Sequence, residues 1–198
     1  MQSIIKSILY DSAEVKKKVA DNLSEKIEEI ATVIIKSIRQ GGKVVLFGNG
    51  GSAADAQHIQ GELTHQLDIK NRKAIPSIAL NTNSSVLTAI GNDWGYDRVF
   101  ERQIEAFVQN KDVVIAFSTS GNSINIIKGI IQAKKEGAIT VAFTGRDGGK
   151  IKDIADISFI VPSDSTQRIQ EVHITVGHII CKLVEDELYS IKRVKGEK

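Results

Sequence analysis

Residues 43–62 constrain the fold more strongly than any other part of the chain. They begin with an unbroken apolar run, residues 44–47, which is typical of a parallel strand covered on both faces. Gly48, Gly50 and Gly51 follow immediately, and glycine permits the positive φ angles and close backbone approach of a tight turn. The stretch therefore predicts a buried strand, a glycine-rich turn and a helix.

The predicted helix begins at Ala53, and its start is a candidate anion site. Ser52 is placed to cap it, and the backbone N–H groups at a helix N-terminus favour a negatively charged ligand. A plain turn without a ligand is the alternative on this stretch alone. The glycine spacing also fits a dinucleotide fingerprint loosely, but that fold has an acidic residue after its second strand, where this chain has Asn81.

His58 and Glu62 lie four residues apart on the same predicted helix, so their side chains point the same way, one turn apart. An imidazole and a carboxylate in this arrangement can hold a metal ion or move protons. A solvent-exposed helix pair is the simpler interpretation unless other residues converge on them.

Four further apolar runs predict strands at residues 75–80, 112–117, 140–143 and 157–161, each next to a helical pattern. Strands that alternate with helices form a parallel sheet with helices on both faces. The predicted fold class is therefore α/β, a three-layer αβα sandwich with a central five-stranded parallel sheet. Binding sites in such sheets lie at the carboxyl ends of the strands.

The loop after the third predicted strand carries the strongest binding signal. Hydroxyl residues surround a glycine and an asparagine at the start of the next helix: Ser118, Thr119, Ser120, Gly121, Asn122 and Ser123. Hydroxyl and backbone donors at a helix N-terminus suit the oxygens of a phosphate monoester. Helix capping by the serines is the alternative.

Helical periodicity dominates both ends of the chain. Residues 3–39 predict one or two amphipathic helices, divided near residues 21–22, whose apolar stripe serves either oligomer formation or core packing. Residues 166–191 predict a last helix, with Gln170 and His178 about two turns apart, and residues 192–198 are expected to fray. The buried stripe of this helix is predicted to be Ile169, Val172, Val176, Ile179, Ile180 and Leu183.

Composition excludes several classes of protein. The chain has 26 basic and 24 acidic residues, and this balance gives no indication of binding to nucleic acid or to an anionic membrane. The single cysteine, Cys181, allows no intrachain disulfide. Lys6 and Asp11 interrupt the first apolar residues before the core of a signal peptide or a membrane span, so we expect a cytoplasmic protein.

Five ordered motifs resemble those of sugar isomerase (SIS) domains, and among these the phosphoheptose isomerases. They are residues 48–53 (GNGGSA), 91–93 (GND), 118–123 (STSGNS), 144–149 (TGRDGG) and 168–173 (RIQEVH). The resemblance implies oligomerisation helices at residues 1–40, an SIS domain at residues 41–193, and a homotetramer with active sites between subunits. It also implies conversion of sedoheptulose 7-phosphate to D-glycero-D-manno-heptose 7-phosphate through an enediol, the first step towards activated heptose for surface polysaccharides.

By position, the resemblance assigns catalysis to Glu62, as the carboxylate that moves a carbon-bound proton, and to His178, as the acid that serves the oxygens; the sequence leaves an exchange of these roles open. The implied substrate contacts are Asn49, Gly50, Gly51, Ser52, Glu62, Asn92, Asp93, Ser118, Thr119, Ser120, Ser123 and Gln170. One zinc ion per subunit is implied at His58, Glu62, Gln170 and His178, although glutamine is an unusual zinc ligand and the reaction does not require a metal.

The chain departs from the family pattern at two places. Many relatives have Leu-x-Gly-Arg after the glutamate, where residues 63–66 here are Leu-Thr-His-Gln, so a cationic substrate contact is either missing or supplied by Arg72. Gln167 replaces an aspartate of some relatives, and an expected contact to a sugar hydroxyl is then lost.

Two other functions remain possible within the family. A related branch is tetrameric, lacks the catalytic pair and binds a replication initiator protein, and the presence of Glu62 and His178 argues against it. The other is a sugar-phosphate sensor fused to a DNA-binding domain, but no helix-turn-helix pattern or basic face precedes the SIS region.

Overall fold

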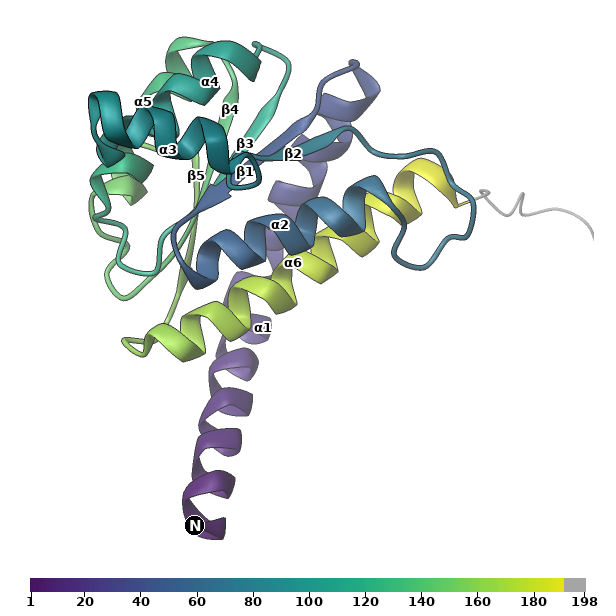
Figure 1. The fold of residues 1–198 in the computed structure, drawn as a ribbon. Coiled ribbons are helices and arrows are strands. Elements are labelled where there is room, and N and C mark those ends of the chain that lie inside the picture. The colour runs from purple at the N-terminus through teal and green to yellow at the C-terminus, as the bar shows by residue number, and fades with distance from the viewer. Residues whose placement is uncertain (191–198) are drawn as a thin grey trace, which may run out of the picture.

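The computed structural model describes residues 1–190 and has the α/β architecture that the sequence predicts (Figure 1). Its sheet is five-stranded and entirely parallel, in the order β2-β1-β3-β4-β5. The strands are β1 (Val44–Gly48), β2 (Ser77–Ala79), β3 (Val113–Phe117), β4 (Ile139–Gly145) and β5 (Ile157–Val161).

Helices cover both faces of the sheet. One face packs against α1 (Gln2–Arg39), α2 (Gly51–Thr64) and α6 (Thr166–Tyr189). The other packs against α3 (Ser84–Trp94), α4 (Glu101–Phe107) and α5 (Ile124–Lys135). Two short 3₁₀ helices, η1 (Tyr96–Arg98) and η2 (Lys150–Asp153), lie in connections. Within residues 1–190, no helix combines the length and apolar character needed to cross a bilayer.

The side chains of β1 divide between two hydrophobic cores, as the unbroken apolar run predicts. Val44 and Leu46 belong to the core beneath α1, α2 and α6, whereas Val45 and Phe47 belong to the core beneath α3, α4 and α5. All four side chains are fully buried. A strand held on both faces and by neighbours on both edges gives the glycine turn that follows it a rigid support.

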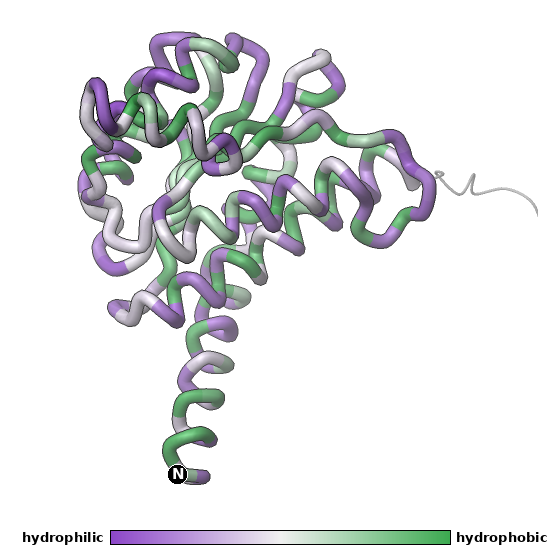
Figure 2. Tube along the Cα trace, viewed as in Figure 1, coloured by the Kyte–Doolittle hydropathy of each residue, from purple (hydrophilic) through white to green (hydrophobic). Residues whose placement is uncertain are grey.

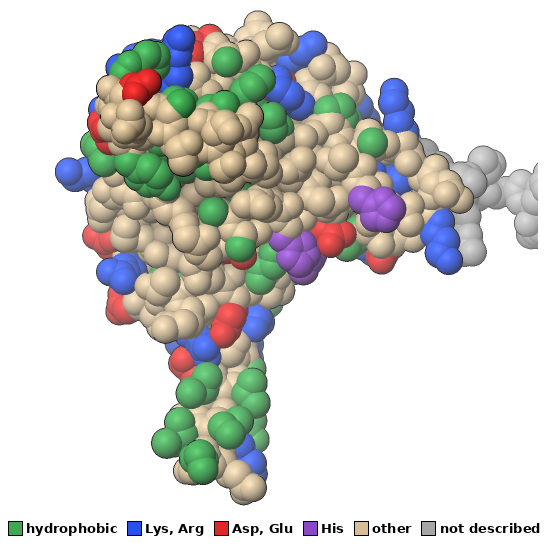
Figure 3. Space-filling model, in the orientation of Figure 1, with side chains coloured by type: hydrophobic (Ala, Val, Ile, Leu, Met, Phe, Trp, Pro, Cys, Tyr) green, Lys and Arg blue, Asp and Glu red, His purple; other side chains and the backbone are tan. Residues whose placement is uncertain are grey.

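Helix α1 is one continuous helix and does not divide near residues 21–22. Its later apolar residues, including Val19, Ile27, Ile30 and Ile34, are buried in the core shared with α6 and the sheet. Its start projects away from the sheet and displays hydrophobic side chains (Figures 1, 2 and 3). These are Ile4, Ile5, Ile8, Leu9 and Tyr10, which are 50–71% exposed. Core packing therefore accounts for the later part of the apolar stripe but not for its beginning.

The length of β2 and the buried stripe of α6 differ from the sequence prediction. Strand β2 has three residues instead of six, because the Ile75 N–H donates to the Leu63 carbonyl at the end of α2 and Pro76 has no N–H to donate. Ile179 and Leu183 are 42% and 39% exposed, because they border a hollow between α1 and α6 and do not face the sheet. The expectations for residues 191–193 and for a frayed tail lie outside the described residues.

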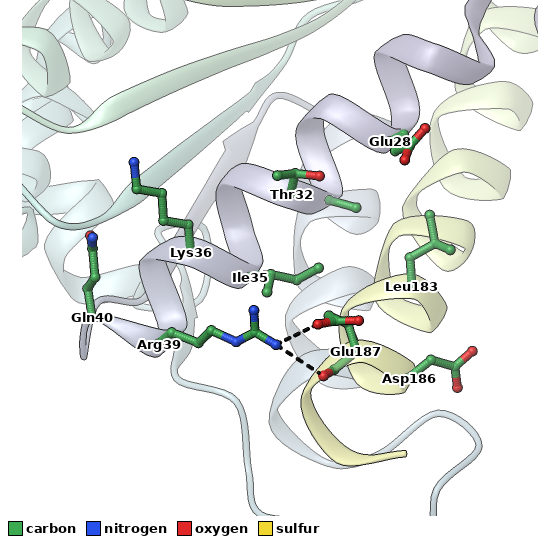
Figure 4. A pocket seen from close by; sticks show the side chains of 10 residues that line it. Glu28, Thr32, Ile35, Lys36, Arg39, Gln40, Leu183, Asp186 and Glu187 are labelled. Atoms are coloured by element: carbon green, nitrogen blue, oxygen red, sulfur yellow. Dashed lines mark hydrogen bonds and ion pairs between the residues drawn. The ribbon is translucent and has the colours of Figure 1, made fainter. Parts of the chain in front are cut away.

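A second hollow, of about 620 Å³, separates the last turns of α1 and α6 (Figure 4). Ile35 and Leu183 form part of its apolar wall, and Arg39 spans it to donate to Oε1 of Glu187 over 2.6 Å. None of the residues predicted to touch substrate lines this hollow. Ligand sites in parallel α/β sheets lie instead at the carboxyl ends of the strands.

Candidate active site

The turn after β1 begins its helix earlier than the sequence predicts. Gly50, with φ of 57°, is the N-cap of α2, and the helix starts at Gly51 instead of Ala53. Ser52 is consequently buried inside the first turn, where its side chain makes no capping hydrogen bond, so the predicted cap was wrong. The N–H groups of Ser52 and Ala53 donate to the carbonyls of Asn49 and Gly50, both over 3.0 Å. These two amides close the turn and are not free for an anion.

Two asparagines fasten this turn to neighbouring segments. Asn81 donates from Nδ2 to the Gly48 carbonyl (2.8 Å) and accepts the Gly48 N–H at Oδ1 (3.2 Å). Asn125, buried in the first turn of α5, exchanges two 2.9 Å amide hydrogen bonds with Asn49. The residue that argues against dinucleotide binding is thus a structural anchor. Sequence reasoning missed Asn125, whose only signal was an amide side chain just beyond the hydroxyl loop.

The hydroxyl loop, residues 118–123, packs against Gly148 and Gly149 of the 144–149 motif. Gly121 has φ of 64°, and a Cβ there would lie 2.0 Å from the Gly148 carbonyl oxygen. The Ile151 N–H donates to the Gly121 carbonyl over 3.1 Å. Ser123 is the N-cap of α5, but its side chain makes no capping hydrogen bond. Capping therefore does not explain the Ser123 hydroxyl, which is available for a ligand.

His58, Glu62 and His178 converge where α2 packs against α6. Nε2 of His58 lies 3.3 Å from Oε1 of Glu62 and 3.0 Å from Nε2 of His178. The helices approach closely because residue 177 is glycine: a Cβ there would lie 2.2 Å from Cδ1 of Ile59. Figure 3 shows histidine and acidic side chains at the surface over these helices. A third group from a distant helix thus joins the His58–Glu62 pair, which is the convergence that a functional site requires.

His58, Glu62 and His178 offer donor atoms that could hold a metal ion, and the two contacts of His58, 3.0 and 3.3 Å, match the spacing of zinc ligands. All three lie within 4.8 Å of one another. Ligand atoms about 2.0 Å from a tetrahedral zinc are about 3.3 Å apart, and two imidazoles with a carboxylate form a known catalytic donor set that leaves one position open. Gln170 lies about two turns before His178 on α6, where its Nε2 would be 2.6 Å from a Cβ on Gly51. Its amide therefore lies over the start of α2.

Asn92 and Asp93 lie apart from this cluster in the chain. They form part of the exposed last turn of α3, where Nδ2 of Asn92 donates to Oδ1 of Asp93 over 2.7 Å. Within residues 1–190, no hydrogen bond or ion pair connects them to the other predicted site residues. Tyr96, just beyond them, reaches the glycine turn through a 3.4 Å hydrogen bond to Oδ1 of Asn49.

Arg72 and Gln167, the residues involved in the two departures from the family pattern, lie in different surroundings. The Arg72 side chain is only 1% exposed and is paired with Glu185, so it does not supply a substrate contact. Gln167 is exposed beside the start of α6 and accepts a 3.0 Å hydrogen bond from the Ser165 hydroxyl.

Burial shifts the pKa of three groups close to the cluster. It raises the pKa of Asp55, one turn before His58, from 3.8 to about 6, against the opposing effect of His58, and leaves Oδ2 of Asp55 without a partner among the described residues. It lowers the pKa of His173 to about 4, so this motif histidine is a neutral core residue on the Thr144 carbonyl. It raises the pKa of Cys181 to about 12, and the thiol is therefore not a nucleophile at neutral pH.

We expect Asp55→Asn to stabilise the zinc-free protein more at pH 7.5 than at pH 4. The folded protein holds the Asp55 proton up to about pH 6, whereas the unfolded chain loses it near 3.8. The stability gained from this proton is complete below pH 3.8 and is lost as the pH rises towards 6, so the wild type carries a cost above pH 6 that asparagine lacks. Urea unfolding of both proteins measures the difference. Asp164→Asn, at an exposed position, is the matched control for the substitution itself. An equal effect of Asp55→Asn at both pH values would contradict the shift.

Comparison with known proteins agrees with the motifs. The sequence model of the SIS domain matches residues 9–145 of the chain. The phosphoheptose isomerase of Aquifex aeolicus is 52% identical over 182 residues, which cover 92% of this chain and 95% of that protein. A structure of phosphoheptose isomerase from Neisseria gonorrhoeae superposes with a TM-score of 0.88 at 37% identity, covering 93% of this chain and 98% of that one. The corresponding Francisella tularensis structure gives 0.90 at 31% identity, with coverage of 93% and 98%. The chain therefore belongs to the SIS domain family and, within it, to the phosphoheptose isomerases.

Proposed function

We propose that the protein is a sedoheptulose 7-phosphate isomerase that forms D-glycero-D-manno-heptose 7-phosphate. The observation that carries the proposal is that Glu62 and His178, from helices far apart in sequence, lie close together in this chain. The similarity to phosphoheptose isomerases supports it. A carboxylate and an imidazole held together are the groups that proton transfer between neighbouring carbons requires. The reaction is the first step towards activated heptose for surface polysaccharides, and it takes place in the cytoplasm.

Glu62 is the base in this mechanism. Its carboxylate removes the proton from C1 of the ketose and returns it to C2, through a cis-enediolate. A positioned base of this kind contributes a factor of about 100 to 10,000. The side chain is 23% exposed, so it is accessible to a substrate while its position remains fixed by the packing of α2.

His178 transfers protons to and from the sugar oxygens O2 and O1. It donates a proton to O2 as the carbonyl becomes a hydroxyl, and it accepts the proton of O1 as the aldehyde forms. Nε2 of His58, 3.0 Å away, orients the ring. His58, Glu62 and His178 are the residues that would hold zinc with one position open, and the ion would supply Lewis acidity for the charge on the enediolate oxygen. Gln170, the fourth ligand that the family resemblance implies, would close that position, and its amide lies against Gly51 at the start of α2.

The hydroxyl loop binds the phosphate in this proposal. β1 and β3 are neighbours in the sheet, so the glycine turn and the hydroxyl loop leave the same edge side by side. Ser123, whose side chain does not cap α5, supports this role, and the buried Asn125 holds the two loops in register. An extended sugar phosphate then runs from this loop to the cluster on α2 and α6.

Glu62→Gln and His178→Gln should each lower kcat by about 100-fold or more, because each keeps the size of the side chain and removes its proton-transfer function. The assay follows formation of the aldose from sedoheptulose 7-phosphate by NMR. Gln57→Ala, at an exposed position of the same helix α2, is the control and should leave kcat unchanged. Near-normal turnover by Glu62→Gln would exclude Glu62 as the base.

Replacing Ser118, Ser120 and Ser123 together by alanine should raise KM far more than it lowers the melting temperature. Each donor to a charged group contributes about 1.5–3 kcal/mol. Ser85→Ala, exposed at the start of α3, is the matched control. An unchanged KM in the triple variant would place the phosphate elsewhere.

We expect a homotetramer with active sites between subunits, since the exposed apolar start of α1 offers a surface that a second copy would cover. Light scattering should give about 86 kDa, four times the 21.6 kDa chain. Ile5→Asp with Ile8→Asp should reduce this mass. A 21.6 kDa species for the wild type at micromolar concentration would contradict the assembly.

A further inference from the structure

A buried ion pair connects the two helices of the proposed active site. Arg72 lies in the connection between α2 and β2, and Glu185 lies on α6, about two turns after His178. Their side chains are 1% and 0% exposed. None of the proposed catalytic steps uses either residue. Because two charges withdrawn from water are costly unless their geometry is well matched, such a pair calls for an explanation.

The Arg72 guanidinium holds α2 and α6 at the same time. Nε donates to Oε1 of Glu185 over 2.5 Å, and Nη2 donates to the backbone carbonyl of Glu62 over 2.7 Å. The Glu62 carbonyl belongs to the last turn of α2, where carbonyls lack a partner within the helix. Arg72 therefore caps α2 at the residue that carries the proposed base.

Glu185 fixes the connection from the other side. Its carboxylate accepts the backbone N–H groups of Leu67 (3.2 Å) and Asp68 (2.8 Å) in addition to Arg72. Burial disfavours the charged carboxylate, but the hydrogen bonds from Asp68, Arg72 and Leu67 outweigh this effect and hold the pKa of Glu185 below its usual value. The pair is therefore charged at neutral pH, and α6 determines where α2 ends.

We propose that Arg72 and Glu185 are a positioning pair that sets the register of α2 against α6 and thereby holds Glu62 beside His178. The meaning of this register rests on the proposed function, in which these two residues act on one substrate. The rigid planar guanidinium donates from two separate nitrogens to a side chain of one helix and a backbone carbonyl of the other, whereas an ammonium group must serve both acceptors from one nitrogen. A displacement of about 1 Å at a reacting group costs about 100-fold in rate, so a fixed register has a kinetic consequence.

The first test is Arg72→Lys, which keeps the charge and removes the two-ended contact. We expect kcat to fall about 10-fold with KM changed less than twofold, and the affinity for Zn²⁺ alone, measured by competition with a chromogenic chelator, to fall about 10-fold. Arg39→Gln breaks an exposed contact between α1 and α6 and is the matched control, with both quantities within twofold of the wild type. Wild-type kcat and zinc affinity in a folded Arg72→Lys protein would overturn the proposal.

A second variant guards against unfolding caused by an unpaired buried charge. Arg72→Met combined with Glu185→Leu removes both charges and leaves apolar packing, so it should fold. We expect the same loss of kcat and zinc affinity, and a folded double variant with wild-type values would refute the positioning role.

The failure of the proposed function is separable from the failure of this inference. If the wild type does not isomerise sedoheptulose 7-phosphate, the proposed function fails, whereas the zinc affinities of wild type and variants still decide the positioning role. If the wild type also binds no zinc, crystal structures of wild type and Arg72→Lys decide it. A longer separation between Glu62 and His178 in the variant supports the pair, and an unchanged separation overturns it.

Discussion

The close packing of α2 on α6 is the contact on which the candidate site depends. Gly177 permits it, because any larger residue would press into Ile59, and the neighbours of these two residues in sequence are His178 and His58. The same contact therefore brings together the imidazoles whose Nε2 atoms are 3.0 Å apart. At the start of α2, the buried strand β1 and the asparagine anchors on Gly48 and Asn49 fix the helix to the sheet.

The electrostatic character of the site follows from this packing. Two imidazoles and a carboxylate lie together without a fixed cation among the described residues, in a part-exposed position. Such a group binds a cation or shares protons readily, and both properties suit an enediolate reaction. Asp55, one turn before His58, adds a half-buried carboxyl whose pKa is raised by burial to about 6.

The fold was predictable from local patterns, whereas parts of the site were not. The unbroken run in β1 and the alternation of strands and helices predicted the sheet, and spacing alone placed His58 beside Glu62. The predicted helix cap at Ser52 was wrong because Gly50, with its positive φ, takes the capping position. Convergence with His178 followed from family resemblance, since no local pattern connects residues 120 positions apart.

Long-range partners explain what sequence reasoning missed. Arg72 looked like an exposed cation available to a substrate, and only the fold reveals that Glu185, 113 positions away, buries it. Ile179 and Leu183 fit the helical stripe of α6, but the stripe alone does not tell which apolar residues meet the sheet and which border a hollow.

The most direct test of proton transfer by a carboxylate is isotope exchange with solvent. The wild-type enzyme would be incubated with sedoheptulose 7-phosphate in heavy water, and deuterium at C2 of the aldose would be measured by NMR. Because Glu62 is partly exposed, the proton that it carries should exchange, and the account predicts deuterium at C2. Formation of the aldose with complete retention of protium, as a direct hydride shift would give, would contradict it.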